Sequence, residues 1–364
     1  MDLGSSRVVS IDALRGFDMF WIIGGGEVFT SLTETWKHPA AQTIQRQLSH
    51  VTWEGFHFED LIFPLFVFIV GAVLPFSVSR RLERGQSLAG VYLHIVKRTI
   101  VLILLGLVFN GLLHFNWPQM RWPGVLQRIG LCYFFAAMLV IHTKWRTQAI
   151  VAAAILLLYW AVMTLVPVPG YGRGVLTAEG CLSSYIDQQL IPGKLYYIHG
   201  DNEGLISTLP AICTALLGVL AGHWLRSNRS GGYKAAGLTI AGLLCLVVGY
   251  VWGLFFPIIK IIWTSSYVLY AGGWSLLLLA LFYWMIDVKG YKKWSIFFIV
   301  IGMNPITIYF LQSFVGFDEI AEFFLVGISQ HAGLFKPLVL AIGALMVKWL
   351  LLWFLYRRRI FFRI

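Results

Sequence analysis

Long apolar stretches recur along the whole chain, and they constrain its fold more than any other feature. About 20 mostly apolar helical residues cross the hydrocarbon core of a bilayer, and the sequence contains about ten stretches of that length. Strand-like alternation is absent from them, so helices must satisfy the backbone groups in lipid. The sequence therefore predicts an all-α, polytopic integral membrane helical bundle. The expected spans lie near residues 8–29, 58–79, 95–114, 123–142, 147–166, 204–225, 235–257, 264–286, 294–315 and 335–356.

Charge is scarce and unevenly placed along the chain. Only 12% of the residues are charged, about half the fraction of an ordinary soluble domain, which excludes a single water-soluble globule. The net charge of +11 would indicate a polyanionic partner in a soluble chain. Here the basic residues gather at one set of span ends, as at Arg80, Arg81 and Arg357–Arg359, where they mark the cytoplasmic side. The charge therefore predicts two cytoplasmic termini in a lipid bilayer and no nucleic-acid partner.

One continuous transmembrane domain over residues 1–364 is expected, with two long exterior loops at about 30–57 and 167–203. Loops of that length are usually functional or disordered. The first either lies in the membrane interface or plugs the bundle from outside. The second resembles a folded lid or a carbohydrate-facing surface, although aromatic anchoring at the interface explains Tyr196 and Tyr197 equally well. No His or Cys pair has a metal-site spacing, so no metal is expected.

Acid–base chemistry is indicated by a histidine and an aspartate in and after the first exterior loop. His50 precedes Asp60 by ten residues, and Asp60 opens an apolar helix. A carboxylate there complements the positive end of the helix. If the loop folds back, the same carboxylate holds an imidazole N–H and fixes its tautomer, as in a catalytic triad. The spacing alone leaves both interpretations open.

Two arginines are expected at membrane depth. A charge there costs about 2.5 to 3.5 kcal/mol, so it needs compensation. Arg15 has Asp12 and Asp18 three residues to either side, and a salt bridge with one of them competes with a role in binding. Arg128 is expected to pair with Asp60 or with a polar network near the site, which would support catalysis.

Ordered sequence blocks resemble the heparan-alpha-glucosaminide N-acetyltransferase family and its bacterial relatives, which are transmembrane acyltransferases. The resemblance covers nearly the whole chain in the family's order. The blocks are SIDALRGFDM (10–19), HVTWEGFHFEDLIFPLFVFIVG (50–71), RWPGVLQRIGLCYF (121–134), DNEGLISTLPAICTALLGVLAG (201–222), WTSSYVLYAGG (263–273), MIDVKG (285–290) and GMNPITIYF (302–310).

The resemblance implies that acetyl passes from cytosolic acetyl-CoA to the amine of a glucosamine-type sugar on the exterior side. It places an essential histidine on His50 and the family's helix-opening aspartate on Asp60. It also implies a bacterial inner-membrane protein that forms a homodimer. Ile22 stands where the family has an asparagine before its glycine run, and Gln312 lies near the place of a family histidine. These departures bear on the acceptor more than on the reaction.

The donor end of the site follows from the chemistry of acetyl-CoA. Its phosphates cannot cross hydrocarbon, so they are expected at the basic cytoplasmic mouth, beside Arg15, Lys97 and Arg98. The oxyanion of the tetrahedral centre needs donors, for which Asn304 and Trp53 are candidates. Trp53 is also assigned to the acetyl-CoA end of the site. His50 acts either as general base or as acetyl carrier.

The acceptor end is expected where the second exterior loop meets the sixth span. His199, Asp201 and Glu203 are candidates for binding sugar hydroxyls and the ammonium group, although helix capping by Asp201 also explains the pattern. A secondary transporter that uses Arg15 and Arg128 remains an alternative. It predicts that solute accumulation depends on an ion gradient. A further alternative is O-acetylation of an exported glycan or lipid, which product analysis separates from amide formation.

Overall fold

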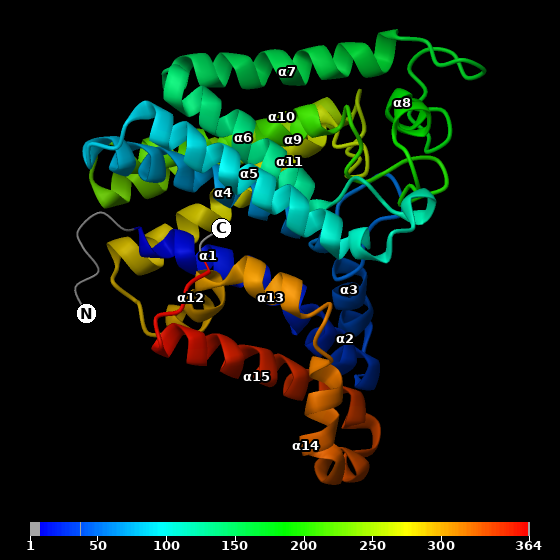
Figure 1. The fold of residues 1–364 in the computed structure, drawn as a ribbon, viewed down its shortest axis with the longest axis vertical. Coiled ribbons are helices and arrows are strands. Elements are labelled where there is room, and N and C mark those ends of the chain that lie inside the picture. The colour runs from blue at the N-terminus through cyan, green and yellow to red at the C-terminus, as the bar shows by residue number, and fades with distance from the viewer. Residues whose placement is uncertain (1–7, 37, 363–364) are drawn as a thin grey trace. The chain divides into compact units, whose positions relative to one another are not determined.

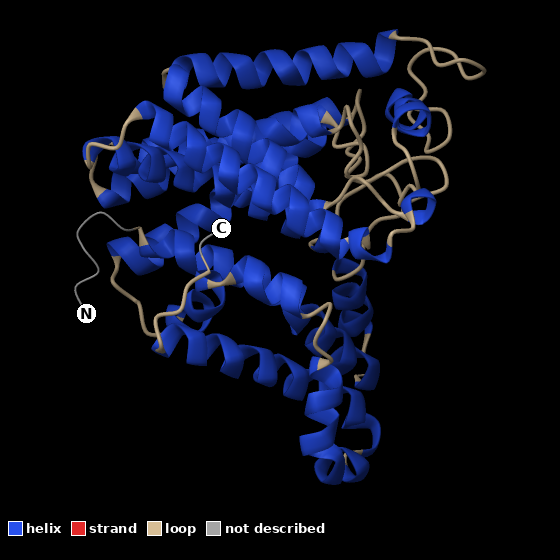
Figure 2. Ribbon diagram, viewed as in Figure 1, coloured by secondary structure: helices blue, strands red, loops and turns tan. Residues whose placement is uncertain are grey.

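The computed structural model describes residues 8–36 and 38–362, which fold almost entirely as helices (Figure 2). Within these residues β structure is limited to isolated bridges, such as the one between Glu54 and Ile259. The all-α prediction is therefore confirmed. The α-helices are α1 (Val9–Phe20), α2 (Gly26–Thr35), α3 (Pro39–Gln47), α4 (Glu59–Glu83), α5 (Leu88–Phe109), α6 (Val125–His142), α7 (Trp145–Leu165), α8 (Leu182–Leu190), α9 (Thr208–Arg226), α10 (Gly231–Gly253), α11 (Ser265–Tyr283), α12 (Ser295–Met303), α13 (Pro305–Leu311), α14 (Phe317–His331) and α15 (Lys336–Arg357).

Among the described residues, 8 helices are long and apolar enough to cross a membrane. The other two expected spans are also helical, but each is interrupted. Between α1 and α2 the chain passes through a π-helix at Trp21–Gly25, in which Gly24 has a φ of 137° that favours glycine. Between α12 and α13 lies Asn304, followed by Pro305, whose ring removes a backbone donor. The protein is a polytopic helical membrane protein with two broken segments.

Contacts divide the described chain into two compact units. The first contains the chain up to Val51, residues His57–Ile62 and the chain from Leu281 onward, and the second contains Thr52–Phe56 and Phe63–Ala280. The single-domain expectation stays a prediction.

The first unit is built around α1, which packs along α12, while α14 packs along α15 (Figure 1). The N-terminus of α1 is capped from a distant part of the chain. The two carboxylate oxygens of Asp287 accept the backbone N–H groups of Val9 at 3.2 Å and Ser10 at 3.0 Å. A carboxylate at this position satisfies exposed donors and complements the positive end of the helix dipole.

The second unit is a bundle in which α5 packs against α6, and α9 contacts both α6 and α7 (Figure 1). The approach of α9 to α4 depends on a small residue. A Cβ added at Gly218 would lie 1.9 Å from the carbonyl oxygen of Phe68, so only glycine permits this separation. Small residues at helix interfaces are typical of membrane bundles, since they let backbones come close.

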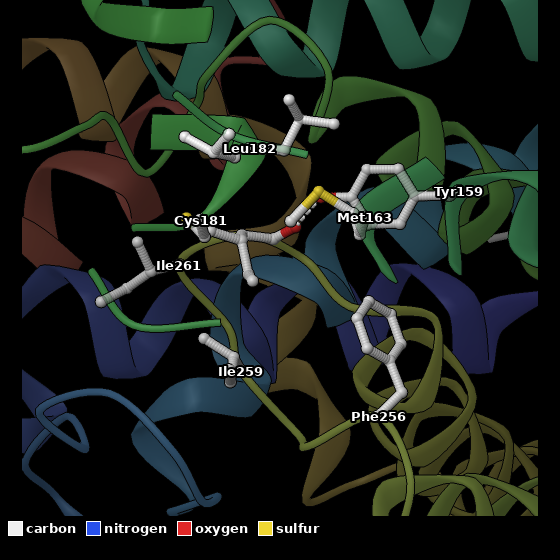
Figure 3. Close-up of a cluster of buried hydrophobic side chains, with 9 residues drawn as sticks. Tyr159, Met163, Cys181, Leu182, Phe256, Ile259 and Ile261 are labelled. Atoms are coloured by element: carbon white, nitrogen blue, oxygen red, sulfur yellow. Dashed lines mark hydrogen bonds between the residues drawn. The ribbon is translucent and has the colours of Figure 1, made fainter. Parts of the chain in front are cut away.

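The segment of residues 167–203, which the sequence predicts as the second exterior loop, is folded and anchored to α7. Tyr159 and Met163 of α7 form a buried apolar cluster with Cys181, Phe256 and Ile261 (Figure 3). The hydroxyl of Tyr159 donates to the carbonyl of Ile262 at 2.5 Å, which satisfies the polar atom in this cluster. The loop is therefore held by apolar packing, and its polar side chains have defined positions.

Candidate active site

The segment that follows α3 folds back onto the start of α4, as the histidine–aspartate interpretation requires. His50 Nδ1 lies 2.9 Å from Asp60 Oδ1. Asp60 Oδ2 accepts the backbone N–H of His57 at 3.0 Å and that of Val51 at 3.4 Å. From the first turn of α4, the carboxylate thus binds the backbone that precedes the helix and holds the imidazole at once. A carboxylate at this place also complements the positive end of the helix, so the two interpretations of Asp60 are compatible.

Local hydrogen bonds explain why the loop adopts this conformation. The side-chain oxygen of Gln47, at the end of α3, accepts the N–H of Phe58 at 3.0 Å. The ring Nδ1 of His57 lies 2.8 Å from the carbonyl oxygen of Ser49. These bonds tie the end of α3 to the start of α4 and fix the loop between them.

The burial of the two partners differs sharply. The Asp60 side chain is 0% exposed, whereas that of His50 is 58% exposed. A buried carboxylate that accepts from Nδ1–H leaves the basic lone pair on the other ring nitrogen, Nε2. The arrangement therefore presents an oriented imidazole to water or to a substrate, which suits a general base or a nucleophile.

Arg15 is paired with Asp12, which decides between its two expected partners. Its Nη2 lies 2.8 Å from Asp12 Oδ1, and its Nε donates to the carbonyl of Gly302 at 2.7 Å. Asp18 is fully buried, and neither of its carboxylate oxygens has a hydrogen-bond partner among the described residues. Glu59 lies within electrostatic reach of it. The salt-bridge alternative for Arg15 is confirmed, and its role toward acetyl-CoA stays a prediction.

Both expected oxyanion donors already have partners within their own units. The side-chain amide of buried Asn304 donates to the carbonyl of Ile360 at 3.0 Å and accepts the N–H of Phe362 at 3.0 Å. The indole N–H of Trp53 donates to the carbonyl of Leu176 at 2.7 Å. Asn304 thus holds the segment after α15 against the helix break, and the N–H of Trp53 orients its ring.

Lys97 and Arg98, two of the three expected phosphate-binding residues, lie on α5. The guanidinium of Arg98 lies over the ring of Tyr133, 4.4 Å from its centroid, and Lys97 is exposed. A guanidinium stacked in this way still has donors at its edge.

Asp201 and Glu203 are bound by an arginine that the sequence interpretation did not assign. Arg121 donates to both oxygens of Asp201, at 2.8 and 2.5 Å, and also to Glu203. The helix-capping explanation for Asp201 is wrong, because α9 begins only at Thr208. The carboxylate of Asp201 instead accepts hydrogen bonds from Arg121. Arg121 opens the family-like block at 121–134, which is the one signal that pointed to it.

Arg128 is buried in a polar network of the second unit. Its Nη2 donates to the carbonyl of Gly204 at 3.1 Å and to the hydroxyl of Ser207 at 2.5 Å. Its guanidinium lies 4.9 Å from the ring centroid of Trp263. This is the network alternative that the sequence left open for Arg128.

Asp187 of α8 is a second residue that the sequence interpretation missed. Its Oδ1 accepts the N–H of Leu205 at 2.9 Å, and its Oδ2 accepts that of Asp201 at 3.4 Å. Burial raises the pKa of Asp187 to about 6, against the opposing effect of these backbone donors. The two hydrogen bonds of Asp187 connect α8 to the segment that leads into α9.

His199 lies apart from the Arg121 ion pairs. Its Nε2 is 3.6 Å from Glu179 Oε1, and its side chain lines a cavity of about 370 Å³ together with Trp53 and two tyrosines. Across residues 8–36 and 38–362, no group of three or more His, Cys, Asp or Glu side chains has the geometry to hold a metal ion.

Comparison with known proteins agrees with the ordered sequence blocks. A family model described as a domain of unknown function (DUF5009) matches residues 7–178. Heparan-alpha-glucosaminide N-acetyltransferase from Mus musculus is 28% identical over 99% of this chain, and that from Homo sapiens is 27% identical over 98%. The chain spans 61% and 60% of the length of these curated relatives. This helical membrane protein is therefore similar in sequence, along nearly its entire length, to proteins named heparan-alpha-glucosaminide N-acetyltransferase.

Proposed function

We propose that this protein is a transmembrane acetyltransferase that moves acetyl from cytosolic acetyl-CoA to the amine of a glucosamine-type sugar on the exterior side. The observation that carries the proposal is the contact between exposed His50 and buried Asp60, 2.9 Å apart. Similarity to proteins named heparan-alpha-glucosaminide N-acetyltransferase supports the reaction class. The proposed place is the bacterial inner membrane, with both termini in the cytoplasm and two copies in a homodimer.

In the first route, His50 is a general base that accepts and returns one proton, and Asp60 stays ionised. A sugar ammonium first loses one proton to solvent, because only a neutral amine attacks a thioester. As the C–N bond forms, His50 accepts the second proton, and the thiolate of CoA leaves when the tetrahedral centre collapses. His50 then returns that proton to the thiolate, directly or through water. Asp60 stabilises the imidazolium that forms in between.

A second route uses the same two residues. Nε2 of His50 attacks the thioester, the C–S bond breaks and CoA leaves as the thiolate. The acetyl-imidazolium then transfers acetyl to the neutral amine, and the proton that the amine releases passes to the thiolate, directly or through water. Asp60 orients the ring in both routes, since it holds Nδ1 and leaves Nε2 to react.

The donor is proposed to enter from the cytoplasm. Its phosphates remain on the basic side, and its uncharged pantetheine arm reaches toward the exterior half of the bilayer. Lys97 is exposed and Arg98 keeps edge donors, so these two are the first candidates for phosphate contact. Arg15 would have to exchange Asp12 or Gly302 for a phosphate, which makes it a weaker candidate.

The decisive experiment reconstitutes purified protein with acetyl-labelled acetyl-CoA and a panel of glucosamine-bearing acceptors. We expect a labelled amide product with the wild type and its loss with His50→Ala. Transfer that is independent of His50 would refute the site assignment. An ester product would identify the reaction as O-acetylation. Gradient-driven accumulation of a solute without acetyl-CoA would show that the protein is a transporter and not an acetyltransferase.

A further inference from the structure

The second unit contains an aromatic cavity among its exterior segments. The cavity has a volume of about 370 Å³, and its walls include Trp53, Tyr196, Tyr197, His199 and Ser184. We call it the aromatic cavity. Its size lies at the lower end of the range of small-molecule sites, which combine apolar walls with a few polar groups.

The aromatic walls are held in place by neighbours. The indole N–H of Trp53 is fixed by the carbonyl of Leu176 at 2.7 Å, and Trp53 packs against the apolar cluster of Figure 3. The ring of Tyr196 has the guanidinium of Arg121 4.6 Å from its centroid. The ring of Tyr197 lies nearly perpendicular to that of Tyr196, with centroids 4.8 Å apart. Such ordered walls reduce the entropy cost of binding.

These fixed rings remain accessible to solvent. Tyr196 is 55% exposed and Tyr197 is 40% exposed. Large aromatic side chains that are rigid and still exposed provide apolar faces, with hydroxyl groups at their edges. His199 and the buried Ser184 are the polar residues next to these rings in the lining of the same cavity.

We infer that the aromatic cavity binds the pyranose ring of the amino-sugar acceptor. The C–H face of a pyranose packs on an aromatic face, its hydroxyls pair with the polar groups, and an ammonium group is attracted to aromatic faces. Asp201 and Glu203 form salt bridges with Arg121 and thereby hold its guanidinium against the ring of Tyr196.

In the sequence, Trp53 of the cavity wall follows His50 by three residues. The identity of the ligand rests on the proposed function, whereas the existence of a sugar site can be measured without any transfer reaction.

The first test is direct binding. Isothermal titration of the detergent-purified full chain uses methyl β-glucosaminide without acetyl-CoA, with cyclohexylmethylamine as an amine that lacks hydroxyls. We expect sugar binding that weakens about three- to tenfold in Tyr197→Ala, as loss of one aromatic contact predicts, and that is largely retained in Tyr197→Phe. Tyr171→Ala is the matched control, since Tyr171 is 51% exposed in the same exterior loop and does not line the cavity.

The second test separates the cavity from the reaction. In the transfer assay, Tyr197→Ala should raise KM for the amino sugar and leave KM for acetyl-CoA unchanged. Sugar binding that depends on Tyr197 in a protein that transfers no acetyl would uphold the cavity and reject the proposed function. Unchanged sugar affinity in both Tyr197→Ala and Trp53→Leu, with unaltered thermal unfolding, would overturn the inference and assign these rings to interface anchoring.

Discussion

The contact between His50 and Asp60 makes a quantitative prediction for Asp60→Asn. The Asp60 side chain is 0% exposed and accepts from His50 Nδ1 and from two backbone N–H groups. An asparagine has one oxygen and one NH₂ group in place of two oxygens. If its oxygen keeps the backbone donors, its NH₂ faces His50 and demands an acceptor at Nδ1. The proton then moves to Nε2, and the reactive lone pair is lost.

The size of the effect follows from the bond that is lost. A hydrogen bond to a charged group contributes about 1.5 to 3 kcal/mol, and each 1.4 kcal/mol corresponds to a tenfold change. Loss of imidazolium stabilisation alone therefore predicts a roughly ten- to hundredfold decrease in kcat. Tautomer reversal increases the loss further, toward the about 10⁴-fold known for a catalytic triad. KM for acetyl-CoA should change little, because Asp60 is placed at the base and not at the phosphates.

The assay is single-turnover transfer of labelled acetyl from acetyl-CoA to an amino sugar in reconstituted vesicles. Asp318→Asn is the matched control, because Asp318 is also in the first turn of a helix of the same unit but is exposed. Thermal unfolding of both variants monitors the fold. An Asp60→Asn variant that keeps the wild-type kcat and still depends on His50 would refute the orienting role of the carboxylate.

Three further predictions concern stability and are measured by thermal unfolding in detergent. Gly218→Ala should destabilise by roughly 1 to 3 kcal/mol, since its Cβ meets the Phe68 carbonyl, whereas Gly232→Ala meets nothing within 4 Å and should be neutral or stabilising. Asp187 has a pKa of about 6 in the folded protein, whereas an aspartate in the unfolded chain has a pKa near 3.9. The free energy of unfolding should therefore fall by up to roughly 3 kcal/mol as the pH rises from about 4 to 7, and Asp187→Asn should remove this dependence on pH. Arg128→Lys should cost roughly 1 to 3 kcal/mol, because an ammonium cannot replace the planar guanidinium over Trp263 and its hydrogen bonds; unchanged unfolding would contradict this.

The helices were predictable because their determinants are local. An apolar stretch of about 20 residues specifies a helix in lipid whatever its neighbours are. The break at Asn304 has a local cause as well, since Pro305 is visible in the sequence. The π-helix before α2 has no comparable signal. Its φ of 137° at Gly24 occurs within a glycine run that also suits close helix packing.

The candidate site was predictable only in part, for the same reason. Asp60 at a helix start and His50 ten residues earlier are close in the chain, so a short loop can join them. Asp201 and Arg121 are 80 residues apart, and nothing local indicates their ion pair. The amide of Asn304 is likewise taken by Ile360, a partner 56 residues away. A polar residue at depth signals that a partner exists, but its identity depends on tertiary packing.

The two arginines expected at membrane depth, Arg15 and Arg128, also bear on the transporter alternative. A proton or solute path needs titratable groups that exchange partners as the protein moves. Arg15 is held by Asp12, one turn away, and by the carbonyl of Gly302, while Arg128 is held by the carbonyl of Gly204 and the hydroxyl of Ser207. Of these partners only the Asp12 carboxylate titrates, whereas the carbonyl and hydroxyl oxygens hold the guanidinium groups without exchanging protons. The exposed imidazole of His50 on the buried carboxylate of Asp60 is better suited to moving a proton.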